Sequence, residues 1–275
     1  HSGAPVASWK RLLKRIVVGR FYRGLAGALA VGESNRAYHR LYGLPEERIF
    51  PGVLPADGRR LLAAVPDPRA ARNEVRAGSG IPEDAVVALF CGNLTPWKRA
   101  ADLAVAVEAA GPPVWGLVVG DGPERQRIAA VAARSDRIRL AGFVNQSAIP
   151  RYFTAADLLV VPSERDAHPL VVTEALFHGL PIVVSDAVGC IGPGDTAQVG
   201  RNAVVFPSGE VAALTKLLVD LSGDASRLAR MGEESRAIAP GHDATSAARL
   251  LAHAVRATIR LGPRQVRNRG VGGGA

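Results

Sequence analysis

Apolar runs of strand length recur between residues 86 and 207, and they constrain the fold more than any other feature of the chain. Most are continuous rather than alternating, as expected of strands that are buried on both faces of a parallel sheet. The predicted strands are Val86–Cys91, Val114–Val119, Ile138–Ala141, Leu158–Val161, Ile182–Val184 and Ala203–Phe206. Segments with helical spacing, such as Arg99–Ala110 and Glu124–Ala133, separate several of them. This alternation predicts an α/β fold built on a doubly wound parallel sheet.

The remaining segments define the predicted domain boundaries. Residues 51–82, with several Pro and Gly, are predicted to form a linker and a first helix at Ala70–Ala77. The domain that carries the sheet then covers residues 83–240, and a C-terminal helix covers residues 241–261. Residues 262–275 are rich in Gly and Arg, and we expect them to be disordered.

Residues 1–50 contain too few elements for a domain of their own. The pattern predicts short strands at Ala28–Val31 and Arg48–Phe50, with a helix at Asn35–Tyr42 between them that Ser34 caps. Because the chain also starts without Met, we expect this segment to be the remnant of a second, N-terminal domain.

The formal net charge of +9 is concentrated at the two ends of the chain. Residues 1–40 contribute +7 and residues 256–275 contribute +5, which leaves −3 for residues 41–255. This mildly acidic body does not resemble a nucleic-acid-binding surface. Two interpretations of the basic segment Trp9–Arg23 stay open: contact with an acidic membrane surface or a lipid-linked substrate, or an ordinary solvated face.

Composition excludes several other classes of protein. At 48% hydrophobic residues the chain can bury a full core, but its longest apolar runs fall far short of the roughly 18 residues of a membrane-spanning helix. Cys91 and Cys190 are the only cysteines, without CxxC spacing or a His-rich neighbourhood, so neither a disulfide framework nor a zinc site is expected. A soluble protein of the reducing cytoplasm fits these observations best.

Doubly wound sheets bind ligands beyond the carboxyl ends of their strands, so four loops are the candidate site. They follow Cys91, Val119, Ala141 and Val161. The first loop, Gly92–Arg99, lacks both the P-loop and the GxGxxG signatures. Lys98 of this loop stands at a helix start, where it can still bind a phosphate together with backbone N–H groups. The alternative is that Lys98 is an ordinary solvated lysine after a turn. The second loop, Gly120–Pro123, is by itself an ordinary turn.

The fourth loop and the segment that continues it, Pro162–Pro181, carry the strongest signal. A helix is predicted to begin at Pro169 and to end at Gly179, so that its N-terminus points toward the ligand and offers an anion site. Asp166, just before this helix, suits hydroxyl groups better than phosphate. Glu174 lies within an otherwise apolar helix, where a carboxylate is costly unless it binds donors, and a structural salt bridge is the alternative.

Asp166 and Glu174, with seven residues between them, are followed by Ala175–Pro181, and this stretch resembles the acid-x7-Glu and EAxxxGxP motif of glycosyltransferase family 4 in the GT-B superfamily. Four further stretches are similar to motifs of that family. They are Gly92–Lys98 (G-R-L-x-x-x-K), Val119–Pro123 (VGDGP), Ala141–Val144 (GxV) and Ala155–Ser163 (aDxxvxPS). The resemblance implies two Rossmann-like domains, with residues 1–50 the remnant of the acceptor-side domain and residues 83–240 the nucleotide-sugar (donor) domain.

The resemblance also implies roles for individual residues. Lys98 would bind the diphosphate, Glu174 the ribose hydroxyls, and the backbone of Phe143 and Val144 the base. The rest of the donor site would consist of Gly92, Asn93, Asp166, His168, Pro169 and Leu170, the last four facing the donor sugar and its phosphates through side chain or backbone. The implied chemistry is transfer with retention at the anomeric carbon, with Lys98, Asp166 and Glu174 as catalytic residues and no metal or other cofactor.

Two departures from the family pattern affect this site. Asn93 stands where the family usually has Arg, which removes one of two cations for the phosphates. Asp166 stands where the family usually has Glu, which is longer by one methylene. Glu164 and Asp166 also offer a carboxylate pair for a metal, an alternative that the helix signals after them disfavour.

The leading hypothesis is a retaining, metal-independent glycosyltransferase that moves a sugar from a nucleotide-sugar donor to a hydroxyl of a glycan, a lipid carrier or a small molecule. The main alternative is a nucleotide-sugar-binding module without activity, because most of the acceptor domain is missing from the chain. A nucleotide-sugar epimerase and a nicotinamide dehydrogenase are less favoured, the latter because its glycine fingerprint is absent. We expect no nucleic-acid partner, and a cytoplasmic location with peripheral contact at the inner face of the membrane.

Overall fold

The computed structural model describes residues 8–263, with side chains from residue 16 onward. Its internal contacts divide the chain into two compact units. Residues 54–247 form the larger unit, and the smaller one combines residues up to Val53 with residues from Ala248 onward. Most of the predicted disordered tail, residues 262–275, lies outside the described residues.

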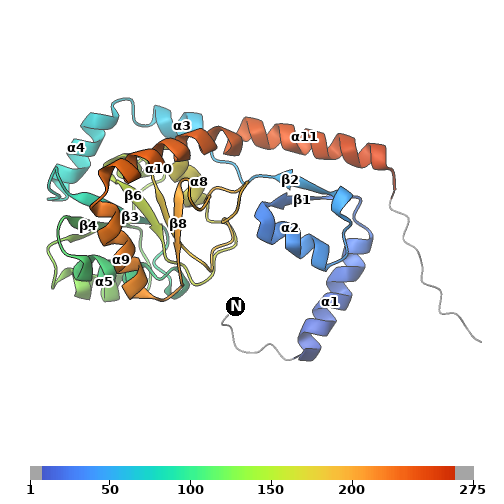
Figure 1. Cartoon of the computed structure of the whole chain (residues 1–275), viewed down its shortest axis with the longest axis horizontal. Helices are drawn as coiled ribbons and strands as arrows, with labels where there is room; N and C mark the ends of the chain where they lie inside the picture. The colour runs from blue at the N-terminus through green and yellow to red at the C-terminus, as the bar shows by residue number, and fades with distance from the viewer. Residues whose placement is uncertain (1–7, 264–275) are drawn as a thin grey trace, which may run out of the picture. The chain divides into compact units, whose positions relative to one another are not determined.

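The larger unit is built on a six-stranded parallel sheet (Figure 1). Its strands are β3 (Val86–Cys91), β4 (Val114–Val119), β5 (Ile138–Gly142), β6 (Leu158–Val161), β7 (Ile182–Ser185) and β8 (Ala203–Phe206). Their order across the sheet is β5-β4-β3-β6-β7-β8, and every neighbouring pair is parallel. The predicted doubly wound parallel sheet is confirmed, and each predicted strand is found with nearly the same bounds.

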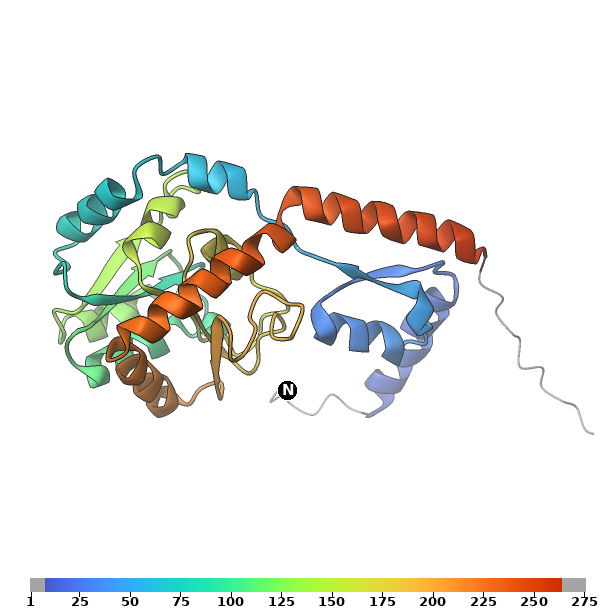
Figure 2. The ribbon, with the colours of Figure 1, turned by 45° about the horizontal axis from the view of Figure 1, so that its top comes forward.

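Helices cover both faces of this sheet (Figure 2). Leu89 and Leu159 point to one face, and their neighbours Phe90 and Val160 point to the other, each pair in its own core cluster. The first face packs against α4 (Pro68–Gly78), α7 (Ile149–Ala155) and α8 (Leu170–Phe177), and the second against α5 (Ala100–Ala110), α6 (Arg125–Ala132) and α9 (Val211–Ser222). This two-sided burial is the reason that the strands are continuous apolar runs.

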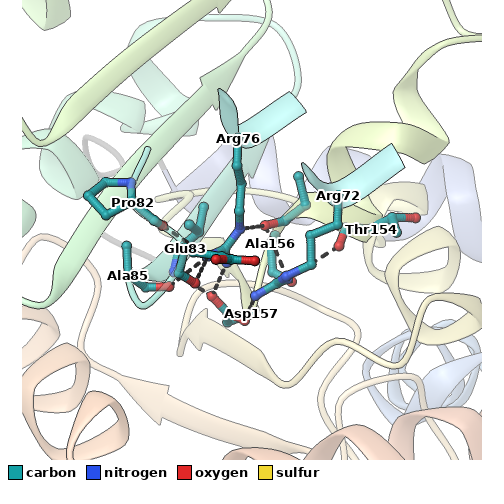
Figure 3. A network of polar contacts seen from close by, with 10 residues as sticks. Arg72, Arg76, Pro82, Glu83, Ala85, Thr154, Ala156 and Asp157 are labelled. Carbon is teal, nitrogen blue, oxygen red and sulfur yellow. Dashed lines mark hydrogen bonds and ion pairs between the residues drawn. The ribbon is translucent and has the colours of Figure 1, made fainter. Parts of the chain in front are cut away.

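An ion-pair network at the amino ends of β3 and β6 anchors helix α4 to the sheet (Figure 3). The Asp157 carboxylate pairs with Arg72 at 2.6 Å and with Arg76 at 2.7 Å, and it accepts the backbone N–H of Val87 at 2.7 Å. The buried Arg76 guanidinium also donates to backbone carbonyls, for example that of Ala155 at 3.0 Å. The partners in this network belong to helix α4 and to the chain next to β3 and β6. The network therefore stabilises the fold, at the edge of the sheet opposite the predicted ligand site. A cavity of about 740 Å³ borders it.

The predicted linker, residues 51–82, contains a helix that the sequence analysis missed. Helix α3 (Gly58–Ala63) precedes α4, and each has an aspartate at its N-cap. The side chains of Asp57 and Asp67 accept the backbone N–H groups three residues ahead, both at 3.0 Å. Each satisfies an N–H group that has no partner within the helix. The larger unit ends with α10 (Ala225–Ile238), a 3-10 turn (Ala239–His242) and the start of α11 (Ala244–Leu261).

The smaller unit contains a two-stranded parallel sheet. Its strands β1 (Ala28–Val31) and β2 (Ile49–Gly52) are joined by helix α2 (Gly32–Leu41) and a 3-10 turn, Glu46–Arg48. Tyr22 of helix α1 (Ser8–Arg23) packs against this pair in a small core with Ala30, Leu44 and Ile49.

The prediction that Ser34 caps the helix of the smaller unit is wrong. Helix α2 begins directly after β1, with Val31 at the N-cap position. Gly32 has a φ of 78°, a backbone conformation that glycine adopts without strain, so the strand turns into the helix three residues earlier than expected. The Asn35 side chain then accepts the Val31 N–H at 3.1 Å from within the first turn.

Candidate functional site

The candidate site lies where the strand order of the sheet reverses. β3 is the first strand of this sheet, β4 and β5 follow on one side of it, and β6 is added on the other side. The connections after β3 and β6 therefore diverge at the carboxyl edge of the sheet, the position at which doubly wound sheets bind ligands. These connections are the loops that carry Lys98 and Asp166.

Lys98 and Asp166 form an ion pair across these two loops. The lysine side chain is 27% exposed and the aspartate side chain 13%. The backbone N–H of Glu164 donates to the Trp97 carbonyl at 2.9 Å, and the Arg165 guanidinium lies 6.0 Å from the centre of the Trp97 ring. Lys98 is therefore held at the edge of the sheet rather than free in solvent, and its contact with phosphate stays a prediction.

Backbone contacts join the neighbouring loops into one rim. The N–H of Gly92 donates to the Val119 carbonyl at 3.0 Å, and the N–H of Gly120 donates to the Gly142 carbonyl at 2.8 Å. Gly120 has a φ of 138°, and a Cβ at this position would overlap the Gly92 carbonyl oxygen. The second loop, which looked ordinary in the sequence, thus determines the position of the first.

Glu174 lies on helix α8, close to Cys91 at the end of β3. Its carboxylate has no hydrogen bond or ion pair within residues 16–263, so the salt bridge considered as an alternative is not found there. Burial raises the pKa of Glu174 above its usual value, although Arg60 lowers it. Burial and the Glu174 charge together raise the pKa of the Cys91 thiol to about 12. A partly buried carboxylate without donors suits a ligand that brings hydroxyl groups.

The other predicted residues lie along the same edge of the sheet. Asn93 is exposed, and so is Phe143, with 79% of its surface accessible. Gly142 has a φ of 72° and turns the chain directly before Phe143. Val144 and Gly92 are half-buried, Pro169 is the buried N-cap residue of α8, and Leu170 is exposed at its first position. The contacts of these residues with a donor stay predictions.

The His168 side chain is 9% exposed, and it lies near two residues that carried no signal in the sequence. Its Nδ1 lies 3.7 Å from Oδ1 of Asp195, which belongs to the loop after β7. His242, in the 3-10 turn before α11, is buried near both. Burial lowers the pKa of both imidazoles, while Asp166 raises that of His168 and Asp195 raises that of His242. No signal in the sequence connects these residues, because they lie far apart along the chain.

Two further properties bear on the class of site. Within residues 8–263, no three His, Cys, Asp or Glu side chains gather in a way that could hold a metal ion. Glu164 and Asp166 each face a cation instead, Arg99 at 3.8 Å and Lys98. Over the same residues, none of the helices has both the length and the apolar character needed to span a bilayer.

Known proteins with similar sequences are glycosyltransferases. The family model described as "Glycosyl transferases group 1" matches residues 71–238. The chain is 31% identical over 233 residues to the 2-deoxystreptamine N-acetyl-D-glucosaminyltransferase of Streptomyces fradiae, covering 81% of this chain and 54% of that protein. It is 29% identical over 242 residues to the D-inositol 3-phosphate glycosyltransferase of Streptomyces avermitilis, covering 80% and 48%. The chain thus spans about half the length of these curated relatives.

Solved structures with the same fold are GT-B glycosyltransferases. Anabaena HepE in complex with UDP has a TM-score of 0.76 at 20% identity, covering 93% of this chain and 70% of that chain. Sucrose-phosphate synthase from Thermosynechococcus elongatus has a TM-score of 0.72 at 20% identity, covering 93% and 65%. At this identity the likeness shows the fold alone. Because the family model spans more than half of the chain, including the loops and helix that carry Lys98, Asp166 and Glu174, the chain belongs to the glycosyl transferases group 1 family.

Proposed function

We propose that this chain carries the donor site of a retaining, metal-independent glycosyltransferase of family 4, which transfers a sugar from a nucleotide sugar to a hydroxyl group. One observation carries the proposal: the Lys98–Asp166 pair lies where the strand order reverses, and so does the Glu174 carboxylate, which has no partner among the residues whose side chains are described. An ammonium beside the N-terminus of helix α8 suits a diphosphate, and a carboxylate suits the hydroxyls of a ribose.

The charges account for the chemistry. As the bond between the anomeric carbon and the diphosphate oxygen breaks, negative charge grows on the leaving nucleoside diphosphate. Lys98 and the N-terminal N–H groups of α8 stabilise this charge more strongly in the transition state than in the bound donor. Asp166 exchanges part of its contact with Lys98 for hydroxyls of the donor sugar. Retention requires that the new bond form on the face of the sugar from which the diphosphate departs.

The comparisons suggest which substrates to test first. Four of the similar solved structures hold UDP or UDP-glucose: three of Anabaena HepE and one of a TarM variant. The names of the curated relatives refer to 2-deoxystreptamine and to D-inositol 3-phosphate. We therefore propose UDP-sugars as donors and small hydroxyl-bearing molecules as acceptors for the first assays.

The test is release of UDP from UDP-sugars by the purified protein, with and without acceptors and with and without EDTA. We expect release that requires an acceptor and continues in EDTA, and a product whose anomeric configuration by NMR is that of the donor. Strict metal dependence or an inverted product would sink the proposal.

A donor-binding module without turnover is the second candidate, because the chain spans about half the length of its curated relatives. Calorimetric binding of a nucleotide sugar, without release of UDP in the presence of acceptors, would favour this candidate. Conversion of the nucleotide sugar without any acceptor would instead indicate an epimerase.

We also propose that helix α1 contacts an acidic membrane surface from the cytoplasmic side. The helix Ser8–Arg23 contains six Lys or Arg and no acidic residue. Ile16, Val17 and Phe21 on it are 56%, 60% and 67% exposed. Exposed apolar side chains among cations match the chemistry of an anionic lipid interface. Cys91 and Cys190 are free thiols, which suits the reducing cytoplasm.

Co-sedimentation with lipid vesicles tests this contact. We expect binding to vesicles that contain phosphatidylglycerol, weaker binding at high salt, and no binding to pure phosphatidylcholine. Phe21→Asp should reduce binding, whereas Val219→Asp, on an exposed position of α9, should leave it unchanged. Equal binding to both kinds of vesicle, or to neither, would refute the contact.

A further inference from the structure

The imidazoles of His168 and His242 lie near the buried Asp195 carboxylate, at the loop that connects β6 to α8. His168 belongs to this loop, Asp195 to the loop after β7, and His242 to the turn before α11. The side chains of His168 and Asp195 are 9% and 2% exposed, and His242 is 5% exposed. Asp195 Oδ1 lies 3.7 Å from His168 Nδ1, and its charge also acts on His242. All three residues lie in the larger unit.

Three of the four ring nitrogens of these imidazoles have no hydrogen-bond partner within the described residues. Neither ring nitrogen of His168 has a hydrogen-bond partner there, nor does Nδ1 of His242. Burial lowers the pKa of both imidazoles, and the adjacent N-terminus of α8 also disfavours a positive charge on His168. In the free protein both imidazoles are therefore neutral near neutral pH.

A bound diphosphate changes this charge balance. It brings at least two negative charges to a site in which Lys98 is already shared with Asp166 and Asn93 contributes no charge. Negative charge near an imidazole raises its pKa, and the Asp166 charge already acts on His168 in this direction. The bound state thus favours an imidazolium that the free state disfavours.

We propose that His168 takes up one proton from solvent when a nucleotide sugar or nucleoside diphosphate binds, and that it thereby supplies the positive charge that Asn93 does not. This proposal rests on the proposed function of the site. Asp195 acts as a positioning residue whose carboxylate accepts a hydrogen bond from Nδ1–H of the imidazolium, which keeps its proton. His242 lies behind it as a second imidazole, and mutual repulsion limits the pair to one proton.

The groups that face His168 come from three elements. Asp166 lies in the same loop as His168, Asp195 lies in the loop after β7 with Cys190 beside it, and His242 lies in the 3-10 turn.

The proposal predicts how affinity depends on pH. Binding raises the pKa of His168, so the gain in affinity is complete below the His168 pKa of the free protein. The gain is lost as pH rises through the His168 pKa of the complex. Because one proton is coupled, the affinity changes by at most about tenfold per pH unit.

Calorimetric titration of the full chain with UDP and with GDP, in buffers of different ionisation enthalpy, measures the protons exchanged on binding. We expect net uptake near pH 7 in the unchanged protein and clearly smaller uptake in His168→Gln and in Asp195→Asn. His253→Gln, at an exposed histidine of α11, should behave like the unchanged protein. Protons that the nucleotide phosphates gain or lose contribute equally in the unchanged protein and in the three variants. Differences in proton uptake between these proteins therefore come from their side chains.

Two outcomes separate this inference from the proposed function. Equal proton uptake in the unchanged protein and in His168→Gln would overturn the inference and leave the donor site standing. Failure to bind UDP, GDP, ADP and dTDP would overturn both. If His168→Gln does not fold, NMR of the imidazole nitrogens in the unchanged protein tests the inference, because it reports the protonation state of His168 with and without UDP. An imidazolium spectrum for His168 after UDP addition supports the inference, and a neutral tautomer with UDP bound overturns it.

Discussion

The Lys98 ammonium pairs with the Asp166 carboxylate across the point where the strand order reverses. The two residues come from loops after different strands, so their contact depends on the sheet that brings β3 and β6 together. The carboxylate engages the same cation that a diphosphate would use. If Lys98 binds the donor diphosphate as proposed, donor binding must share or replace this ion pair.

Replacing Lys98 tests the cation directly. Lys98→Ala should weaken binding of a nucleoside diphosphate by about 10- to 150-fold, because a charge-assisted hydrogen bond contributes roughly 1.5 to 3 kcal/mol. Isothermal titration calorimetry measures the change. Lys216→Ala is the matched control, since Lys216 pairs with Asp220 at 2.6 Å on the exposed side of α9. Similar losses in both variants would contradict a phosphate role for Lys98.

Glu174→Gln should stabilise the protein near pH 7 and weaken donor binding. The carboxylate is partly buried, it has no donor within residues 16–263, and its pKa is raised, so burying its charge opposes folding above the pKa of the unfolded chain. We expect the free energy of unfolding to rise by about 1 kcal/mol near neutral pH. This gain should disappear toward about pH 4, where Glu174 is protonated in both the folded and the unfolded chain. Urea unfolding at both pH values measures it.

The control for this variant is Glu233→Gln, at an exposed position of α10. It should change neither the stability nor the affinity. If Glu174→Gln kept full affinity for a nucleotide sugar, the predicted contact with the ribose hydroxyls would be wrong.

Gly120→Ala should damage both stability and donor binding. An alanine Cβ would overlap the Gly92 carbonyl oxygen, and the φ of 138° is itself unfavourable for alanine. Relief requires a shift of the loop that leads to Lys98, and we expect a loss of about 2 kcal/mol or more in unfolding free energy. Gly78→Ala, in open space at the end of α4, should be neutral or slightly stabilising. Unchanged melting temperatures in both variants would count against this role of Gly120.

His178 should make the folded state sensitive to acid. Its ring stacks on Phe153 with the centroids 5.4 Å apart, and burial lowers its pKa to about 4. The unfolded chain binds the proton more tightly than the folded protein. The free energy of unfolding therefore keeps its full value above about pH 6.5 and falls as pH drops through about 4, by roughly 3 kcal/mol in all. Urea unfolding across this range should show a shallower loss for His178→Gln. Parallel pH profiles for the two proteins would disprove the assignment.

The sequence alone determined the sheet, its strands and the loops that carry the candidate site. Two-sided burial requires continuous apolar runs, and a parallel sheet places the loops after them at one edge, so these features are visible in local patterns. Local patterns failed at Ser34, because the entry into α2 depends on the end of β1 and on the backbone of Gly32. They also failed in residues 51–82, where a short helix gives little periodic signal.

Only the tertiary structure decided which charges meet. The sequence shows that Lys98, Asp166 and Glu174 exist and which elements carry them, but not that Asp166 pairs with Lys98 while Glu174 is left without a partner among the described residues. Asp195 and His242 carried no sequence signal at all. Hydrophobic periodicity is repeated over many neighbouring residues and can be recognised along the chain, whereas an ion pair or a buried imidazole depends on one distance between distant residues, and folding alone sets that distance.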